Sequence, residues 1–145
     1  MPLIIRRATA ADQATITRMI RSANLNRMNL KWPNFLVAEE GGAVVGIGQV
    51  KAHGDGSREV ASMAVVPAWQ GKGIGSAIIK ALIAGEGDRV LYLTCRREMR
   101  GYYERFGFRT IAVADYPPYF ARLIRVVNVF ALLARTEVLV MRRPG

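Results

Sequence analysis

Hydrophobic and polar positions follow two periods along the chain, and the first of them is helical. Ile16, Met19, Ile20 and Ala23 recur at i, i+3, i+4 and i+7, which is the spacing of one apolar helix face. Thr9 stands three residues before Asp12, an arrangement close to a capping box. The pattern therefore predicts an amphipathic helix shortly after Thr9.

Short apolar runs bounded by turn residues predict strands. Gly41–Gly42 separates two of these runs and predicts a hairpin between them, and Pro67 ends a later run. The predicted strands cover residues 3–8, 34–40, 43–52, 58–66, 89–95, 108–115 and 136–142.

Helical spacing returns three times in the second half of the chain. Ile74, Ile78 and Leu82 predict a helix that ends at Gly85 or Gly87. Residues 97–106 predict another, stopped by Gly107, and residues 117–135 contain a third. The segment "LNRMNLKW" at 25–32 fits either a short helix or a loop. Strands first and helices interleaved later predict an α/β fold, with one mixed sheet, helices on both faces and a single domain over 1–145.

Composition removes several classes of site. The 145 residues include one cysteine and one histidine, which excludes an internal disulfide and a four-cysteine zinc site, so no metal is expected. His53 lies in a polar, glycine-rich stretch without a nucleophile motif, which argues against a Ser-His-Asp triad. Charge appears too early for a signal peptide, and the apolar run at 126–134 is far shorter than the ~20 residues of a membrane span, so we expect a cytoplasmic protein with no membrane partner.

The net charge of +10 suggests an anionic partner. Both halves of the chain are basic, and no basic tail is present. A nucleic-acid-binding domain is therefore the weakest of the readings considered, and we expect no nucleic acid partner. A small molecule that carries phosphate groups is another anionic partner that would fit the positive net charge.

Three glycines gather between a predicted strand and a predicted helix, in "VVPAWQGKGIGSAII" at 65–79. No G-x-x-x-x-G-K-[ST] pattern occurs, which excludes a Walker loop. The third glycine comes one position too early for a dinucleotide fingerprint, and an insert separates strand from glycines. A flexible turn does not require three alternate glycines. Backbone N–H groups at a helix start favour a bound phosphate.

The stretch resembles the signature of the GNAT superfamily of acetyl-CoA-dependent N-acetyltransferases, Gln/Arg-x-x-Gly-x-Gly/Ala at the start of a helix. Here it reads Gln70-Gly71-Lys72-Gly73-Ile74-Gly75. "GYYERFGF" at 101–108 resembles the family's second motif, F-Y-x-x-x-G-F, and the likeness extends over nearly the whole chain. It implies a mostly antiparallel, twisted sheet of about six to seven strands, flanked by helices on both faces.

The resemblance also implies a set of residues that bind acetyl-CoA. The backbone before Pro67 would hold the pantetheine arm and polarise the thioester carbonyl, and the glycine loop would wrap the pyrophosphate. Lys72 either adds charge near the phosphates or is a solvated lysine. The implied residues are Met63, Ala64, Val65, Gln70, Gly71, Lys72, Gly73, Ile74, Gly75 and Ser76.

Two residues are implied for the chemistry. Tyr103 occupies the place of the family's general acid, and its alternative is a packed core tyrosine. Glu59, at the start of the strand before the glycines, is the candidate general base, directly or through water, and its alternative is a strand-end charge beside Arg58. Many relatives carry an Asn after the fifth strand, whereas this chain has Thr94-Cys95-Arg96-Arg97. Arg96, Arg97 and Arg100 either favour an anion or form a solvated face.

The resemblance thus predicts an N-acetyltransferase that moves an acetyl group from acetyl-CoA to a primary amine of a small molecule or protein. The reaction would proceed by direct attack in a ternary complex. The alternative is a non-catalytic acyl-CoA-binding module. The family often forms dimers through its C-terminal strands and helix, so the resemblance favours a homodimer through the apolar stretch at 126–140, and the alternative is that this stretch belongs to the intramolecular core.

Overall fold

The computed structural model describes residues 2–134 and 137–145, with residues 128–134 described as backbone only. Its strands are β1 (Ile4–Arg7), β2 (Phe35–Glu40), β3 (Ala43–Ala52), β4 (Arg58–Val65), β5 (Leu91–Arg96), β6 (Arg109–Thr110) and β7 (Val138–Arg143). Its helices are α1 (Gln13–Ser22), α2 (Ile74–Glu86), α3 (Arg100–Glu104) and α4 (Pro118–Ala134). Five short 3-10 turns connect these described elements.

The strands form a seven-stranded sheet in the order β1-β2-β3-β4-β5-β7-β6. Neighbours β1–β2, β2–β3, β5–β7 and β6–β7 are antiparallel. β4 and β5 are parallel, with Glu59 opposite Tyr92. The predicted α/β fold with a mostly antiparallel sheet is confirmed. The chain packs as two compact units, residues 1–51 with 60–86 and residues 52–59 with 87–145.

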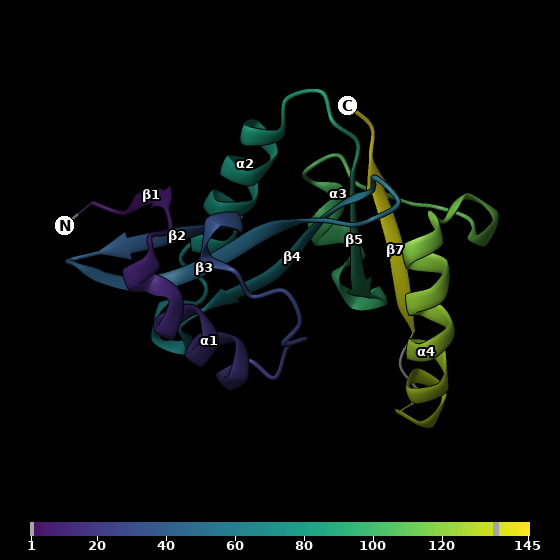
Figure 1. Cartoon of the computed structure of the whole chain (residues 1–145), viewed down its shortest axis with the longest axis horizontal. Helices are drawn as coiled ribbons and strands as arrows, with labels where there is room; N and C mark the ends of the chain where they lie inside the picture. The colour runs from purple at the N-terminus through teal and green to yellow at the C-terminus, as the bar shows by residue number, and fades with distance from the viewer. Residues whose placement is uncertain (1, 135–136) are drawn as a thin grey trace. The chain divides into compact units, whose positions relative to one another are not determined.

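In the first unit, α1 and α2 cover opposite faces of β2 and β3 (Figure 1). The apolar stripe of α1 buries Ile16 and Ile20 completely against Phe35, Val37 and Ile47. Val37 lies opposite Ile47 in the strand register, so these side chains share one face of the sheet. Burial of this stripe fixes α1 to the sheet.

On the other face of β3, Gly46 and Gly48 let α2 approach the strand closely. A Cβ atom on Gly48 would lie 2.5 Å from Met63 Sδ and 2.8 Å from Ile78 Cγ2, closer than real contacts allow. Gly46 has the same relation to Ile74 and Ile78. The two glycines therefore position the first turns of α2, the helix that follows the glycine loop.

The second unit contains β5, β6, β7, α3, α4 and the connection that leads into β4. α4 runs beside β7 (Figure 1), and Phe120 and Ile124 pack against Val140. β5 pairs with β7 over six residues, from Leu91 opposite Arg143 to Arg96 opposite Val138.

Most predicted elements are present, and the exceptions lie where periodicity is weakest. The strand predicted at 108–115 is wrong beyond Thr110: only Arg109–Thr110 pairs with β7, and the chain then turns at Val113–Asp115. Val113 is 74% exposed, so the apolar side chain at this position gains no burial from a strand. The helix predicted at 97–106 begins as a 3-10 turn and is helical only at Arg100–Glu104. Residues 25–31 form a loop, one of the two alternatives left open.

Among the described residues, none of the helices is long and apolar enough to cross a membrane. The predicted dimer surface at 126–140 lies largely outside the residues whose side chains are described, and the homodimer stays a prediction.

Asp12 ties the start of α1 to β1, and we predict that this tie is lost in acid. Its carboxylate accepts hydrogen bonds from the Arg6 guanidinium at 2.8 and 3.2 Å and from the Thr9 N–H at 2.7 Å. The bond from Arg6 lowers the pKa of Asp12 to about 2, although burial opposes it. Asp12→Asn should lower the free energy of unfolding by about 1–2 kcal/mol at pH 7.

Because the folded pKa lies below the ordinary value of 3.8, the stabilisation is complete above that value and disappears as the pH falls towards 2. Urea unfolding at pH 7 and pH 2.5 measures this, with the exposed Asp115→Asn as control. If the wild type exceeded Asp12→Asn in free energy of unfolding by the same amount at pH 2.5 as at pH 7, the role assigned to Asp12 would be contradicted.

Candidate functional site

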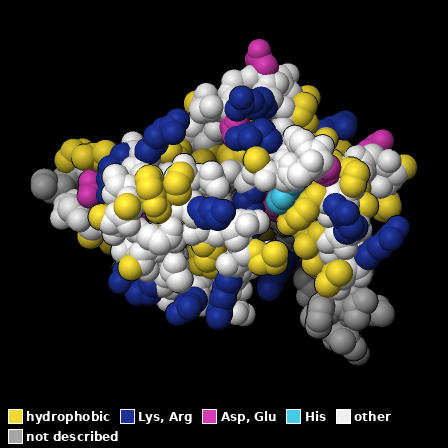
Figure 2. Space-filling model, in the orientation of Figure 1, with side chains coloured by type: hydrophobic (Ala, Val, Ile, Leu, Met, Phe, Trp, Pro, Cys, Tyr) yellow, Lys and Arg dark blue, Asp and Glu magenta, His cyan; other side chains and the backbone are white. Residues whose placement is uncertain are grey.

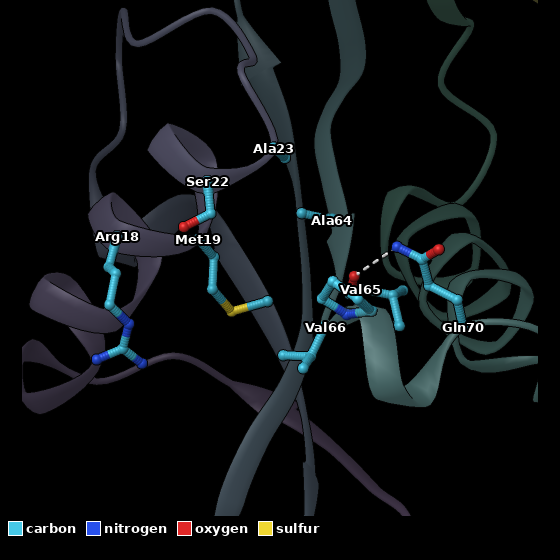
Figure 3. Close-up of a pocket in the computed structure, with 9 residues that line it drawn as sticks. Arg18, Met19, Ser22, Ala23, Ala64, Val65, Val66 and Gln70 are labelled. Carbon is cyan, nitrogen blue, oxygen red and sulfur yellow. Dashed lines mark hydrogen bonds between the residues drawn. The ribbon is translucent and has the colours of Figure 1, made fainter.

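The glycine-rich loop begins where β4 ends, and three hydrogen bonds fix this junction. The Val66 N–H donates to the Val45 carbonyl at 2.9 Å, which holds the strand end against β3. Pro67–Trp69 then form a 3-10 turn, closed by a bond from the Gln70 N–H to the Pro67 carbonyl. The Gln70 side chain turns back and donates from Nε2 to the Val65 carbonyl at 3.0 Å (Figure 3). Gln70 therefore anchors the entrance of the loop.

Gly71 and Gly73 have φ angles of +78° and +80°, in the left-handed region that other residues rarely adopt. No atom lies within 4 Å of a Cβ placed on either residue, so the loop leaves open space beside its backbone. The first bond of α2 runs from the Ala77 N–H to the Gly73 carbonyl at 3.0 Å. Gly75 lies in the first turn of α2.

The N–H groups of Ile74 and Gly75 precede the first intrahelical bond and point out of the helix start. Together with the partial positive charge of a helix N-terminus, they form a site suited to a phosphate. Lys72 adds a full charge, held with its Nζ atom 4.7 Å from the centroid of the Trp69 ring. The predicted loop residues are thus brought together in the first unit.

The last residues of β4 present their side chains alternately to the two faces of the sheet. Ala64 and Val66 pack against the core cluster around α1, and Met63 lies close to Gly48 on the opposite face. Ser62, just before them, has a φ of +58°, unusual for a serine and strained within a strand. Because Met63 and Ala64 pack against other residues, the backbone of residues 63–65 is the part proposed to contact a ligand.

A pocket of about 390 Å³ lies beside the end of β4 within the first unit (Figure 3). α1 contributes one wall and the junction of β4 with the glycine loop the other. Arg18 supplies its positive charge. The lining residues are Arg18, Met19, Ser22, Ala23, Ala64, Val65, Val66, Pro67 and Gln70.

Tyr103 lies on α3 in the second unit, in an aromatic cluster. Its ring centroid is 5.1 Å from that of Tyr102 and 6.4 Å from that of Phe108, both at steep angles. Burial, with smaller contributions from Cys95 and Tyr102, raises the pKa of Tyr103 to about 12. The phenol therefore keeps its proton over the working pH range, as a general acid must.

Glu59 does not stand as a solvated strand-end charge. Its Oε1 atom lies 2.9 Å from Nε2 of His53, and both side chains are more than nine-tenths buried. The His53 ring is stacked on Tyr119, with centroids 3.4 Å apart and an interplanar angle of 14°. Asp55 supports this arrangement because its Oδ2 accepts the Tyr119 N–H at 2.9 Å.

Sequence reasoning missed His53 as a partner of Glu59. The residue was set aside because its neighbours are glycines and polar residues. The turn from His53 to Ser57, closed by a bond from the His53 N–H to the Ser57 carbonyl at 2.9 Å, brings residues 53 and 59 together across two strand ends. The only available signal was this hairpin spacing, since a six-residue separation across a tight turn places two side chains side by side.

The basic residues at the end of β5 and just after it have different surroundings. Arg97 forms an exposed ion pair with Glu137 at 2.8 Å. Arg96 and Arg100 are exposed. On the face in Figure 2, Lys and Arg side chains are interspersed with other surface and form no continuous stripe. Burial raises the pKa of the Cys95 thiol to about 11, which disfavours the thiolate that a nucleophile requires.

The fold is similar to those of solved structures. N-acetylglutamate synthase from Neisseria gonorrhoeae, in complex with coenzyme A and N-acetyl-glutamate, matches 99% of this chain and 35% of its own, with a TM-score of 0.80 and 20% identity. Rv2747 from Mycobacterium tuberculosis, in complex with CoA and a second ligand, matches 98% of this chain and 99% of its own, with a TM-score of 0.76 and 21% identity. Diaminobutyrate acetyltransferase from Paenibacillus lautus matches 76% of this chain and 80% of its own, with a TM-score of 0.62 and 21% identity.

This chain therefore spans about a third of the length of the synthase. No match is found among curated proteins. The family model described as Acetyltransferase (GNAT) domain matches residues 31–110, more than half of the chain, and includes β4, the glycine loop and α3. The chain belongs to the GNAT family of acetyltransferases.

Proposed function

We propose that the protein transfers the acetyl group of acetyl-CoA to a primary amine, by direct attack in a ternary complex. The observation that carries this proposal is the glycine loop, in which two left-handed residues lead into the first turn of α2 beside open space. Residues 70–76 would bind the pyrophosphate, Lys72 adding charge. The CoA present in the three similar structures supports the same co-substrate.

The thioester would lie against the backbone of residues 63–65, whose N–H groups polarise its carbonyl as negative charge develops on the oxygen. Side-chain identity matters little at these positions. The base first takes a proton from the ammonium. The neutral amine nitrogen then forms a bond to the carbonyl carbon, and the carbon–sulfur bond breaks. The departing thiolate takes a proton from Tyr103, and the second proton that the nitrogen loses restores the phenol through solvent.

The base must act because an alkyl ammonium has a pKa near ~10 and cannot attack while protonated. Glu59 is the proposed base, directly or through water, and His53 is its positioning partner at 2.9 Å. The bond to Nε2 holds the carboxylate in one orientation, which helps a base that works through water.

The pocket and the similar structures support one class of acceptor. The P. lautus enzyme is in complex with L-2,4-diaminobutyric acid, and the N. gonorrhoeae enzyme with N-acetyl-glutamate. Arg18 in the pocket wall would complement the carboxylate of an amino acid. Amino acids are therefore the first acceptors to screen, followed by other small amines and by proteins.

We predict that Gly73→Asp weakens acetyl-CoA binding at least fiftyfold, or about 2.3 kcal/mol. An aspartate residue is strained at a φ of +80°, and its carboxylate repels the pyrophosphate. Gly54→Asp is the matched control, since Gly54 also has open space around it but lies in another loop. Isothermal titration calorimetry measures both affinities. A wild-type protein that does not bind acetyl-CoA would overturn the proposal.

Release of free CoA in the presence of an amine panel separates the enzyme from the alternative, a non-catalytic acyl-CoA-binding module. We expect amine-dependent release by the wild type. Tight binding of acetyl-CoA without release for any amine favours the binding module.

Tyr103→Phe should lower kcat about a hundredfold while leaving acetyl-CoA affinity within twofold, because only the proton donor is removed. Since the pKa of Tyr103 is about 12, ionisation of this phenol should not lower the wild-type rate below about pH 11. Tyr102→Phe, the neighbouring position, serves as control. Equal effects of the two substitutions on kcat would refute the assignment of the acid.

Glu59→Gln should lower kcat/KM for the amine about a hundredfold at pH 7. The loss should shrink towards pH 10, where the amine deprotonates without help. His53→Gln should cause a smaller loss with the same pH dependence, because it acts through Glu59. The exposed Glu98→Gln is the control. A pH-independent loss would instead indicate that the pair is only structural.

A further inference from the structure

Two glutamines hold the loop that follows α1, and they differ in one respect. Gln13 uses both ends of its amide: Nε2 donates to the Leu30 carbonyl at 2.6 Å, and Oε1 accepts the Trp32 N–H at 3.0 Å. Gln49 on β3 uses only one. Its Nε2 donates to the Asn29 carbonyl at 3.2 Å and to Ser62 Oγ at 2.7 Å.

Gln49 Oε1 is buried and has no hydrogen-bond partner among the residues that the structure describes. The amide cannot be reversed to satisfy it, because the Asn29 carbonyl can only accept a hydrogen bond and so requires the NH₂ group. The side chain as a whole is fully buried. A buried carbonyl without a donor costs free energy, so an N–H or O–H group that reached this oxygen would be bound favourably.

Ser62 provides an independent indication at the same place. Its φ of +58° is strained for a non-glycine residue, and such strain concentrates at functional sites. The hydroxyl accepts from Gln49 and thereby fixes the orientation of the amide. The strained Ser62 is thus hydrogen-bonded, at 2.7 Å, to the same Gln49 side chain whose oxygen has no described partner.

This pair lies beside the proposed position of the thioester. Ser62 directly precedes residues 63–65, whose backbone is proposed to polarise the carbonyl. Gln49 lies two residues from Ile47, on the sheet face that α1 covers. Ala64 packs on that same face and lines the pocket of about 390 Å³.

The attacking amine needs a neutral acceptor at this place. Its lone pair must point at the carbonyl carbon, so an N–H group is what remains to orient it. As the bond forms, positive charge develops on the nitrogen, and a buried carbonyl dipole stabilises that charge without holding the amine protonated beforehand. A carboxylate would favour the unreactive ammonium.

We propose that Gln49 Oε1 accepts a hydrogen bond from the acceptor's primary amine and so aims its nitrogen at the thioester. The inference rests on the proposed function. Ser62 is a positioning residue, since it acts through Gln49. Entry of the amine requires a shift of the loop that carries Asn29, whose residues 24–29 are all exposed and bury little surface.

The test is an NMR titration of the ¹⁵N-labelled protein saturated with CoA. The probes are methylamine, ethanolamine, L-glutamate and L-2,4-diaminobutyrate. The Gln49 side-chain NH₂ signals are assigned through their contact with Ser62. At least one amine should shift these signals in a saturable manner. Absence of a shift with every amine would overturn the proposal, whatever the outcome of mutagenesis.

Gln49→Met removes the acceptor with little change in volume, and it should weaken binding of that amine at least tenfold while acetyl-CoA affinity stays within twofold. Gln13→Met is the matched control, because Gln13 anchors the same loop with both ends of its amide satisfied. It should change amine affinity less than threefold. Equal losses in both variants would mean that loop anchoring explains the effect, which would overturn the proposal.

CoA release measured on the same samples keeps the two hypotheses apart. Amine binding at Gln49 without turnover would contradict the proposed function and leave standing only the binding of the amine to Gln49. Turnover with unshifted Gln49 signals would contradict this inference and leave the proposed function standing.

Discussion

The left-handed backbone at Gly71 and Gly73 is the constraint on which the rest of the site depends. These two residues turn the chain from the end of β4 into the first turn of α2, and only glycine adopts their φ angles without strain. The turn orients the N–H groups of Ile74 and Gly75 beside the strand end. The Gln70 bond to Val65 and the glycines of β3 secure this junction from the strand and from the helix.

The site divides its tasks between backbone and side chains. In the proposed function, phosphate binding and carbonyl polarisation belong to the backbone of residues 63–65 and 71–76, so small and apolar side chains suffice at these positions. In the proposed mechanism, proton transfer is assigned to two side chains with low exposure, Tyr103 and Glu59. Burial keeps the Tyr103 phenol protonated, and His53 keeps the Glu59 carboxylate oriented. The role proposed for Gln49 adds an acceptor that carries no net charge, for an amine that must be uncharged when it attacks.

Sequence reasoning was sufficient where a local pattern determines the structure. The apolar stripe around Ile16 and Ile20 defines α1, and the spacing of Gly71 and Gly73 defines the loop, since both depend on neighbouring residues. It failed where distant residues decide. The strand predicted at 108–115 stops at Thr110, where β6 ends its pairing with β7, and the chain turns away at Val113–Asp115.

The buried polar groups were missed for the same reason. His53 is remote from any motif, and its stacking on Tyr119 arises from a residue 66 positions later in the chain. The unpartnered oxygen of Gln49 depends on Asn29 and Ser62, which flank it at distances of 20 and 13 residues in sequence. Neither contact has a signature in periodicity or composition.

The central claim is that the backbone amides of the glycine loop bind the pyrophosphate of acetyl-CoA. The most direct test compares amide ¹H–¹⁵N chemical shifts during titration with acetyl-CoA and with acetyl-pantetheine, which lacks the phosphates. The account predicts large shifts at residues 71–76 with acetyl-CoA alone, and shifts at residues 63–65 with both. Residues 71–76 that stay unshifted while acetyl-CoA binds elsewhere would contradict it.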